Sequence, residues 1–298
     1  MVGPNVNCKK CNSTAIAFLK ARDVNRKTTD KEYQYDKCLD CKLIFLRNIP
    51  TKLSEAYTNE YHLIPQSMDQ FVAAAQYERP KIEILKRFVQ KGKLLEIGPS
   101  IGLFAYLAKQ EGFDVEAIEM DPACCKFLNE KIKIPTTETK NIAQYCQNKH
   151  YYDAVVLWQV IEHLEDPWSD LKSIVSALSN NGFLFISTPN PQSFQFRLFK
   201  SRWTHVDAPR HFYLIPISLL IQYLSSLGLK HVYTSTNDPS NLQWNEFGWK
   251  YSLSSLTLNK FKDKLLRKIG SFLSKLFRPI ESINGLGSSY TIVFKKGD

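Results

Sequence analysis

Four cysteines near the start of the chain form two close pairs, a spacing typical of metal ligands. Cys8 and Cys11 make one Cys-x2-Cys pair, and Cys38 and Cys41 make the other. Each tight pair directs two thiolates toward one ion, and four thiolates make a closed tetrahedral site that suits structural zinc. We therefore predict a zinc-binding module over residues 1–50. The alternatives are four unrelated buried cysteines, or an iron–sulfur or redox centre.

A glycine-containing loop that follows a short apolar segment is a second candidate site. Residues 94–104 read LLEIGPSIGLF. Gly98 and Gly102 would let the backbone pass close to a ligand, and the carboxylate of Glu96 would need a partner at the end of a strand. Glu119 lies 21 positions after Gly98, where doubly wound nucleotide-binding folds place an acid on ribose hydroxyls. The loop lacks the G-x-G-x-x-G pattern, so we do not expect a dinucleotide pyrophosphate.

Two polar segments carry candidate acid–base groups. Glu162 and His163 follow the apolar run 153–158, and His211 lies in the segment 203–213, WTHVDAPRHFY. Histidine has the unperturbed pKa nearest neutrality, which favours His163 as a base; alternatively, Glu162 and His163 only shape their loop. The second segment also carries His205, Asp207 and Arg210. These side chains could bind a polar or phosphorylated ligand. Alternatively, the segment folds over a cofactor and Arg210 forms an ion pair.

The elements that would hold these residues alternate between strand and helix patterns from residue 93 onward. We expect strands over 93–97, 114–119, 153–158, 183–188, 230–235 and 289–295, and helices over 101–111, 121–131, 166–178 and 218–227. This alternation predicts the α/β class, with a doubly wound, mainly parallel, seven-stranded sheet of Rossmann-like type. Before it lie the zinc-ribbon-like module, 1–50, and a helical linker, 51–90, which Pro80 should kink or divide. The main domain covers 91–298, with a helical insertion at about 236–287 before the last strand.

Several motifs together resemble those of class I S-adenosylmethionine (SAM)-dependent methyltransferases. The glycine loop is similar to their motif I, with Ser100 at the middle glycine. Residues 152–167, YDAVVLWQVIEHLEDP, and 182–190, GFLFISTPN, are similar to their fourth and fifth strands. Residues 33–45, together with the tyrosines at 57 and 61, resemble a zinc-ribbon module found before many bacterial methyltransferases, several of them in sugar, polysaccharide or antibiotic pathways.

This resemblance implies a cofactor site and a catalytic site. Glu119 would bind the ribose hydroxyls, and Gly98 and Gly102 would line the methionine part of SAM. The other residues implied to contact the cofactor are Glu96, Ser100, Met120, Asn141, Ile142, Trp158 and Gln159. The residues implied in catalysis are His163, His211 and Glu162.

These features predict methyl transfer from SAM to a small-molecule acceptor. The preferred acceptor is a sugar, or a nucleotide- or lipid-linked sugar. One alternative is methylation of RNA or protein. Another is a non-catalytic SAM-fold scaffold that binds partners through the zinc module. The net charge of +10 would suit nucleic acid, anionic lipid or a phosphorylated substrate. The module lacks a run of aromatic residues interleaved with arginine, so we do not favour nucleic acid as a partner.

The cysteines and one basic segment bear on localisation. Seven cysteines, no export signal and no long apolar run lead us to expect a cytoplasmic protein. Residues 258–277 combine an apolar helical stripe with many lysines and arginines, a pattern that suits peripheral contact with the inner membrane face. The alternative, which we favour from sequence, is a lid or a homodimer contact whose stripe packs on protein.

Overall fold

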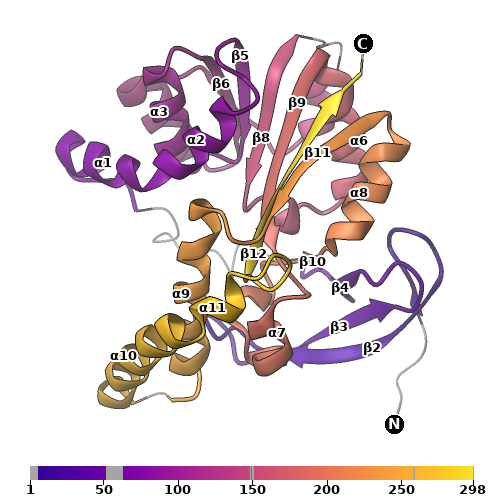
Figure 1. Ribbon diagram of the computed structural model, residues 1–298, viewed down its shortest axis with the longest axis vertical. Coiled ribbons are helices and arrows are strands. Elements are labelled where there is room, and N and C mark those ends of the chain that lie inside the picture. Colours follow the sequence, from indigo (N-terminus) through magenta and orange to yellow (C-terminus); the bar gives the residue numbers. More distant parts are fainter. Residues whose placement is uncertain (1–5, 52–62, 148, 150, 258, 298) are drawn as a thin grey trace.

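The computed structural model describes residues 6–51, 63–147, 149, 151–257 and 259–297. The tyrosines at positions 57 and 61, the start of the expected linker and the leucine at 258 lie outside these ranges. Figure 1 shows the two sheets of the molecule, with a group of helices at the lower left.

The larger sheet has seven strands in the order β11-β12-β9-β8-β5-β6-β7, which confirms the predicted fold class. β9, β8, β5, β6 and β7 run parallel, and β12 is antiparallel to both of its neighbours. The strands are β5 Lys93–Ile97, β6 Asp114–Glu119, β7 Thr136–Glu138, β8 Tyr152–Trp158, β9 Leu178–Pro189, β11 Leu229–Ser235 and β12 Ser289–Lys296.

Helices cover both faces of this sheet because its strands are apolar on both sides. Along β8, Val155 and Leu157 join one hydrophobic core, whereas Val156 and Trp158 join the other. Pro80 lies in the first turn of α2 and divides the helical linker there. The helices are α1 Met68–Ala75, α2 Arg79–Lys86, α3 Leu103–Gln110, α4 Pro122–Phe127, α5 Ile142–Cys146, α6 Pro167–Ala177, α7 Phe194–Phe199 and α8 Ile217–Ser226.

The smaller sheet contains the predicted cysteine module but takes one strand from the main domain. Its order is β1-β2-β3-β4-β10. β10 pairs with β4 in antiparallel register, Tyr213 opposite Phe45 and Leu214 opposite Ile44. The cysteine module is therefore joined through its sheet to the segment that carries His211. The strands are β1 Val6–Asn7, β2 Thr14–Ala21, β3 Tyr33–Cys38, β4 Ile44–Leu46 and β10 Tyr213–Leu214.

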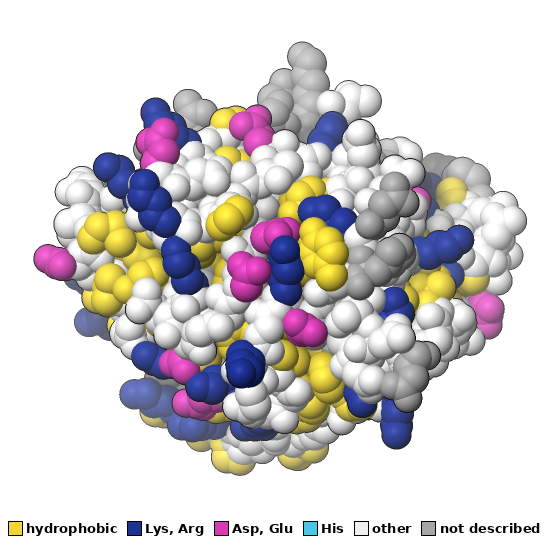
Figure 2. All heavy atoms as spheres, turned by 90° about the horizontal axis from the view of Figure 1, so that it is seen from above, with side chains coloured by type: hydrophobic (Ala, Val, Ile, Leu, Met, Phe, Trp, Pro, Cys, Tyr) yellow, Lys and Arg dark blue, Asp and Glu magenta, His cyan; other side chains and the backbone are white. Residues whose placement is uncertain are grey.

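The insertion before the last strand is helical, as expected. It forms α9 Pro239–Ser254, α10 Lys260–Leu276 and α11 Arg278–Glu281, and these helices project at the lower left of Figure 1. None of the helices in the described parts of the chain has the length and apolar character needed to span a bilayer. Lysine and arginine side chains are spread over the face drawn in Figure 2, with hydrophobic side chains between them.

Candidate active site and metal centre

Three residues of the glycine loop between β5 and α3 have a left-handed backbone conformation. The backbone φ angles of Gly98, Ser100 and Gly102 are 65°, 54° and 79°. A Cβ atom on Gly98 would lie 2.9 Å from Val160, and one on Gly102 would lie 2.2 Å from Leu128. The two glycines are therefore required by backbone conformation and by close packing, and Ser100 accepts a conformation that side chains rarely adopt.

Glu119 ties this loop to the end of β6. Its buried carboxylate accepts hydrogen bonds from the backbone N–H groups of Ser100, Met120 and Asp121, at 2.9, 2.7 and 3.0 Å. An ionised carboxylate has about four acceptor positions, and among the described residues Oε2 accepts from the Ser100 N–H alone. Within this part of the chain, Oε2 therefore keeps an acceptor position for a ligand hydroxyl.

A second buried acid lies beneath the loop, close to a lysine that the sequence analysis did not identify. Glu96 is 4% exposed, and its Oε2 atom has no hydrogen-bond partner among the described residues. Burial raises the pKa of Glu96 to about 8, while the charge of Lys81 opposes that rise. Lys81, on α2, is also buried, and its Nζ lies 5.4 Å from the centre of the Trp158 ring. The sequence did contain a sign of this lysine's role, because Lys81 stands among the apolar positions of α2. We had treated that helix only as a linker.

The remaining residues expected at the cofactor are engaged in different ways. Met120 is exposed and Ile142 is buried. The Asn141 side chain caps α5 by accepting from the Gln144 N–H at 2.9 Å. The Gln159 amide donates to the hydroxyls of Ser187 and Ser289, both at 2.8 Å. The side-chain amides of Asn141 and Gln159 thus hold local structure, and their contact with cofactor stays a prediction.

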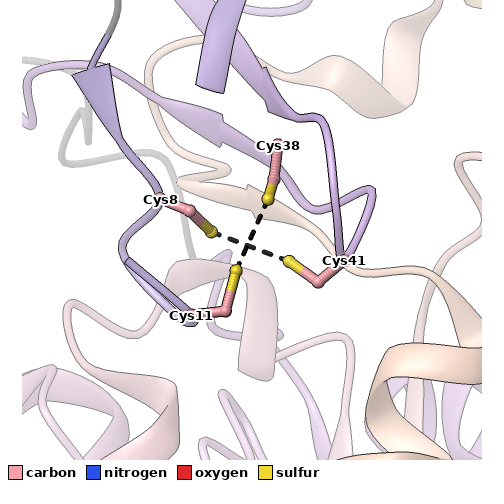
Figure 3. A group of neighbouring side chains, drawn as sticks. All are labelled: Cys8, Cys11, Cys38 and Cys41. Carbon is pink, nitrogen blue, oxygen red and sulfur yellow. Dashed lines mark hydrogen bonds between the residues drawn. The ribbon is translucent and has the colours of Figure 1, made fainter. Parts of the chain in front are cut away.

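The four paired cysteines converge on a single point, as Figure 3 shows. The Sγ–Sγ distances are 3.6 Å between Cys8 and Cys41 and 3.5 Å between Cys11 and Cys38, and all four sulfurs lie within 4.8 Å of one another. Zinc–sulfur bonds of about 2.3 Å in a regular tetrahedron separate the sulfurs by about 3.8 Å. The geometry therefore fits a tetrahedral zinc ion.

The backbone after each cysteine pair explains how the two turns form. Asn12 and Lys42 directly follow Cys11 and Cys41, and their φ angles are 60° and 64°. This left-handed conformation is the one that glycine adopts most easily. Asn12 and Lys42 adopt it nonetheless, and this conformation keeps the turns that direct the thiolates inward.

The three candidate acid–base residues come together although 48 positions separate His163 from His211. Their ligand atoms lie within 4.8 Å of one another, and the two imidazole rings meet edge to face with centres 4.5 Å apart. Glu162 is fully buried and accepts from the Thr188 hydroxyl at 2.9 Å. Its other oxygen, Oε1, has no hydrogen-bond partner among the described residues.

The electrostatics of this cluster favour His211 over His163 as a base. Burial raises the pKa of Glu162 to about 8 and lowers the pKa of His163 to about 3. Burial also lowers the pKa of His211, but the carboxylate of Asp207, 3.8 Å from Nε2, favours the protonated ring. The sequence-based preference for His163 assumed an unperturbed imidazole, which its surroundings do not provide.

Comparison with known proteins shows the family. A family model described as a methyltransferase domain matches residues 69–234, more than half of the chain. The chain belongs to this methyltransferase family. The matched residues include the glycine loop, Glu119 and the cluster of Glu162, His163 and His211. The cysteine module and the helical insertion lie outside them.

Curated relatives and solved structures agree with this assignment. The methyltransferase is 28% identical to the ubiquinone biosynthesis O-methyltransferase of Rickettsia typhi over 120 residues, 39% of this chain and 48% of that protein. It is 28% identical to the protein of that name from Marinobacter nauticus over 115 residues, 36% and 48% of the two chains. It thus matches about half the length of these relatives.

Two crystal structures show the same fold. A SAM-dependent methyltransferase from Archaeoglobus fulgidus has a TM-score of 0.51 and 20% identity, covering 76% of this chain and 94% of that one. A putative sarcosine dimethylglycine methyltransferase from Galdieria sulphuraria has a TM-score of 0.52 and 14% identity, covering 80% and 92%. The predicted resemblance to SAM methyltransferases is therefore confirmed at the level of family and fold.

A buried ion-pair network connects the cysteine module of this methyltransferase to the histidine segment. Arg210 is fully buried and donates to Asp23, at 2.6 and 3.1 Å, and to Asp207, at 2.7 and 2.9 Å. The Tyr35 hydroxyl, on β3, donates to the backbone carbonyl of His211 at 2.8 Å. Arg210 is therefore in an ion pair, the second of the two alternatives expected from sequence, and its guanidinium is buried away from solvent. Sequence reasoning missed Asp23 and Tyr35 as supports of this segment.

Proposed function

We propose that this chain transfers a methyl group from SAM to a hydroxyl group of a small-molecule acceptor. The observation that carries the proposal is the buried cluster of Glu162 and His163, which follow β8, with His211, which precedes β10. Val160, between β8 and this cluster, packs against Gly98 of the glycine loop. Family membership and the O-methyltransferase names of the relatives support the same chemistry.

The residues at the glycine loop fit a bound SAM molecule, which supplies a methyl group activated on a sulfonium. The free acceptor position of Glu119 Oε2 would take a ribose hydroxyl. The backbone at Gly98 and Gly102 allows close approach of the methionine part. Lys81 pairs with Glu78 at 2.5 Å and its charge also acts on Glu96; this buried cation would attract the carboxylate of that part as a further partner. Glu96 Oε2, which is buried without a partner in the described structure, would accept from a donor on the cofactor.

His211 is the group we assign to proton removal from the acceptor hydroxyl. Its ring is neutral at neutral pH because burial lowers its pKa, and Asp207 stabilises the imidazolium that forms once the proton is taken. Glu162, with a pKa of about 8, is largely protonated at neutral pH and can donate a hydrogen bond to the acceptor. The edge-to-face contact with His163 holds the His211 ring in place.

Two acceptor classes follow from different observations. Resemblance of the cysteine module to that of sugar-pathway methyltransferases favours a sugar, or a nucleotide- or lipid-linked sugar. The names of the relatives favour an O-methyl acceptor of ubiquinone biosynthesis. We place sugars first because the module is an integral part of this chain and lies outside the segment that defines the family.

We also propose that the four cysteines hold a structural zinc ion. The convergence of the four sulfurs at distances that suit tetrahedral coordination supports this assignment. A closed set of four thiolates leaves no open position on the ion, so its role would be to stabilise the module.

The test is incubation of the purified protein with methyl-labelled SAM and host extract, followed by separation into small molecules, lipids, RNA and protein. We expect label on an oxygen of a small molecule, with or without a lipid carrier, and loss of that label in the His211→Asn variant. Label confined to RNA or protein would overturn the proposal. Calorimetric SAM binding without any labelled product would point to a non-catalytic scaffold.

A further inference from the structure

The helix α10 presents an apolar stripe to solvent. Five large side chains at helical spacing are 40–81% exposed, far more than the core residues of the chain. They are Phe261, Leu265, Ile269, Phe272 and Leu276. The packing on protein that we favoured from sequence is not found for this stripe in the described structure.

The opposite face of α10 is already occupied, so the stripe is not a misplaced core face. Gly270 meets α9 so closely that a Cβ there would lie 2.7 Å from the Cα atom of Lys250. The Ser271 hydroxyl donates to Glu246 at 2.9 Å, and the Arg267 guanidinium lies over the Tyr251 ring at 4.7 Å. These contacts fix the rotation of α10 and leave the stripe outward.

The flanks of the stripe are basic. Exposed lysines on α10 are Lys262, Lys264, Lys268 and Lys275. Asp263 is the only acid in α10, and it pairs with Arg267 at 3.0 Å. Basic side chains also occur on the face in Figure 2, so charge alone does not identify a docking face. The combination of an exposed apolar stripe with four exposed lysines and a single acid on the same helix does.

We propose that α10 docks in the plane of an anionic lipid bilayer surface, with its apolar stripe in the interface and its lysines at the headgroups. Amphipathic helices with basic polar faces bind membranes in this manner. A second copy packed on the same stripe would bring like-charged lysine flanks together, which disfavours a homodimer there. The proposal is independent of the methyl-transfer reaction.

The experiment is sedimentation of the full chain with vesicles of phosphatidylcholine alone or mixed with phosphatidylglycerol. We expect binding only to the mixed vesicles, with loss at high salt because the attraction is screened. Each basic residue near an anionic surface is worth about fivefold in partitioning. The Lys264→Gln/Lys268→Gln variant should therefore bind about 30-fold more weakly.

Two control variants make the outcome decisive. Lys172→Gln/Lys230→Gln removes the same charge from exposed sites on α6 and β11 and should bind like the wild type. Phe261→Asp/Phe272→Asp should abolish binding while keeping the wild-type circular dichroism spectrum. Absence of wild-type binding to mixed vesicles, equal binding to neutral vesicles, or a Phe261-dependent dimer in sedimentation velocity would each overturn the proposal.

Discussion

Replacing Asp23 with alanine tests whether the cysteine module supports the histidine segment. The Asp23 carboxylate is 4% exposed and accepts from the Arg210 guanidinium, from the Arg26 N–H, and from the N–H and hydroxyl of Thr28. Among the described residues, Asp23→Ala would leave the fully buried guanidinium with one carboxylate partner, Asp207. Removing one partner of a buried ion pair costs about 3–5 kcal/mol, a large share of the roughly 5–15 kcal/mol that stabilises a typical domain.

Urea unfolding followed by tryptophan fluorescence measures this loss, since Trp203 is buried in the same segment. Glu32→Ala is a matched control, because Glu32 pairs with Arg22 on the same module but the side chains are 47% and 62% exposed. An exposed pair is worth less than about 1 kcal/mol. Equal effects of the two substitutions would refute the reasoning.

The same variant distinguishes support of the acceptor side from general damage. Arg210 holds Asp207, and Asp207 faces His211, so Asp23→Ala should lower the turnover number. SAM affinity should change little, because Glu119 and the glycine loop lie on the other sheet. A parallel loss of SAM affinity and turnover would indicate global destabilisation instead.

The remaining predictions concern the cofactor, the metal and pH. Glu119→Gln should weaken SAM binding in calorimetry by about 1–3 kcal/mol, because charge-assisted hydrogen bonds are lost; unchanged affinity would exclude the ribose assignment. Elemental analysis should find about one zinc per chain, and Cys38→Ser should lose it; metal-free protein purified without chelators would contradict the site. Burial raises the pKa of Glu162 to about 8 in the folded chain, above about 4.3 in the unfolded chain. Glu162 therefore lowers the free energy of unfolding as pH rises between those values. In urea unfolding, the free energy of unfolding of Glu162→Gln should exceed that of the wild type by more at high pH than at low pH. A constant difference between the two proteins across this pH range would argue against a raised pKa.

Much of the larger sheet could be predicted because its strands carry their own signal. Parallel strands that are buried on both faces read as short apolar runs, and β5 and β6 have the bounds expected from sequence. β7 was missed because it is a three-residue edge strand, Thr136–Glu138, with one half-buried and two exposed residues and no apolar pattern.

The sequence identified residues of the candidate site, but it did not identify their hydrogen-bond partners. The glycine-loop motif identified Glu119 and Gly98. It did not identify the three backbone N–H groups that donate hydrogen bonds to Glu119. Gln159 was expected to contact the cofactor, yet its amide donates to two serine hydroxyls, one of them on β12. A single sequence gives the polarity of a side chain, whereas its partners depend on which distant strands lie beside it.

The link between the cysteine module and the histidine segment is the clearest case of such a long-range partner. Asp23 and Arg210 are 187 positions apart, and β10 has only two residues, too few for any periodic pattern. Because β10 pairs with β4, and β4 follows the Cys38–Cys41 turn, the shape of that turn bears directly on the position of His211. The cysteine module can therefore position the candidate acid–base residues without contributing one of them.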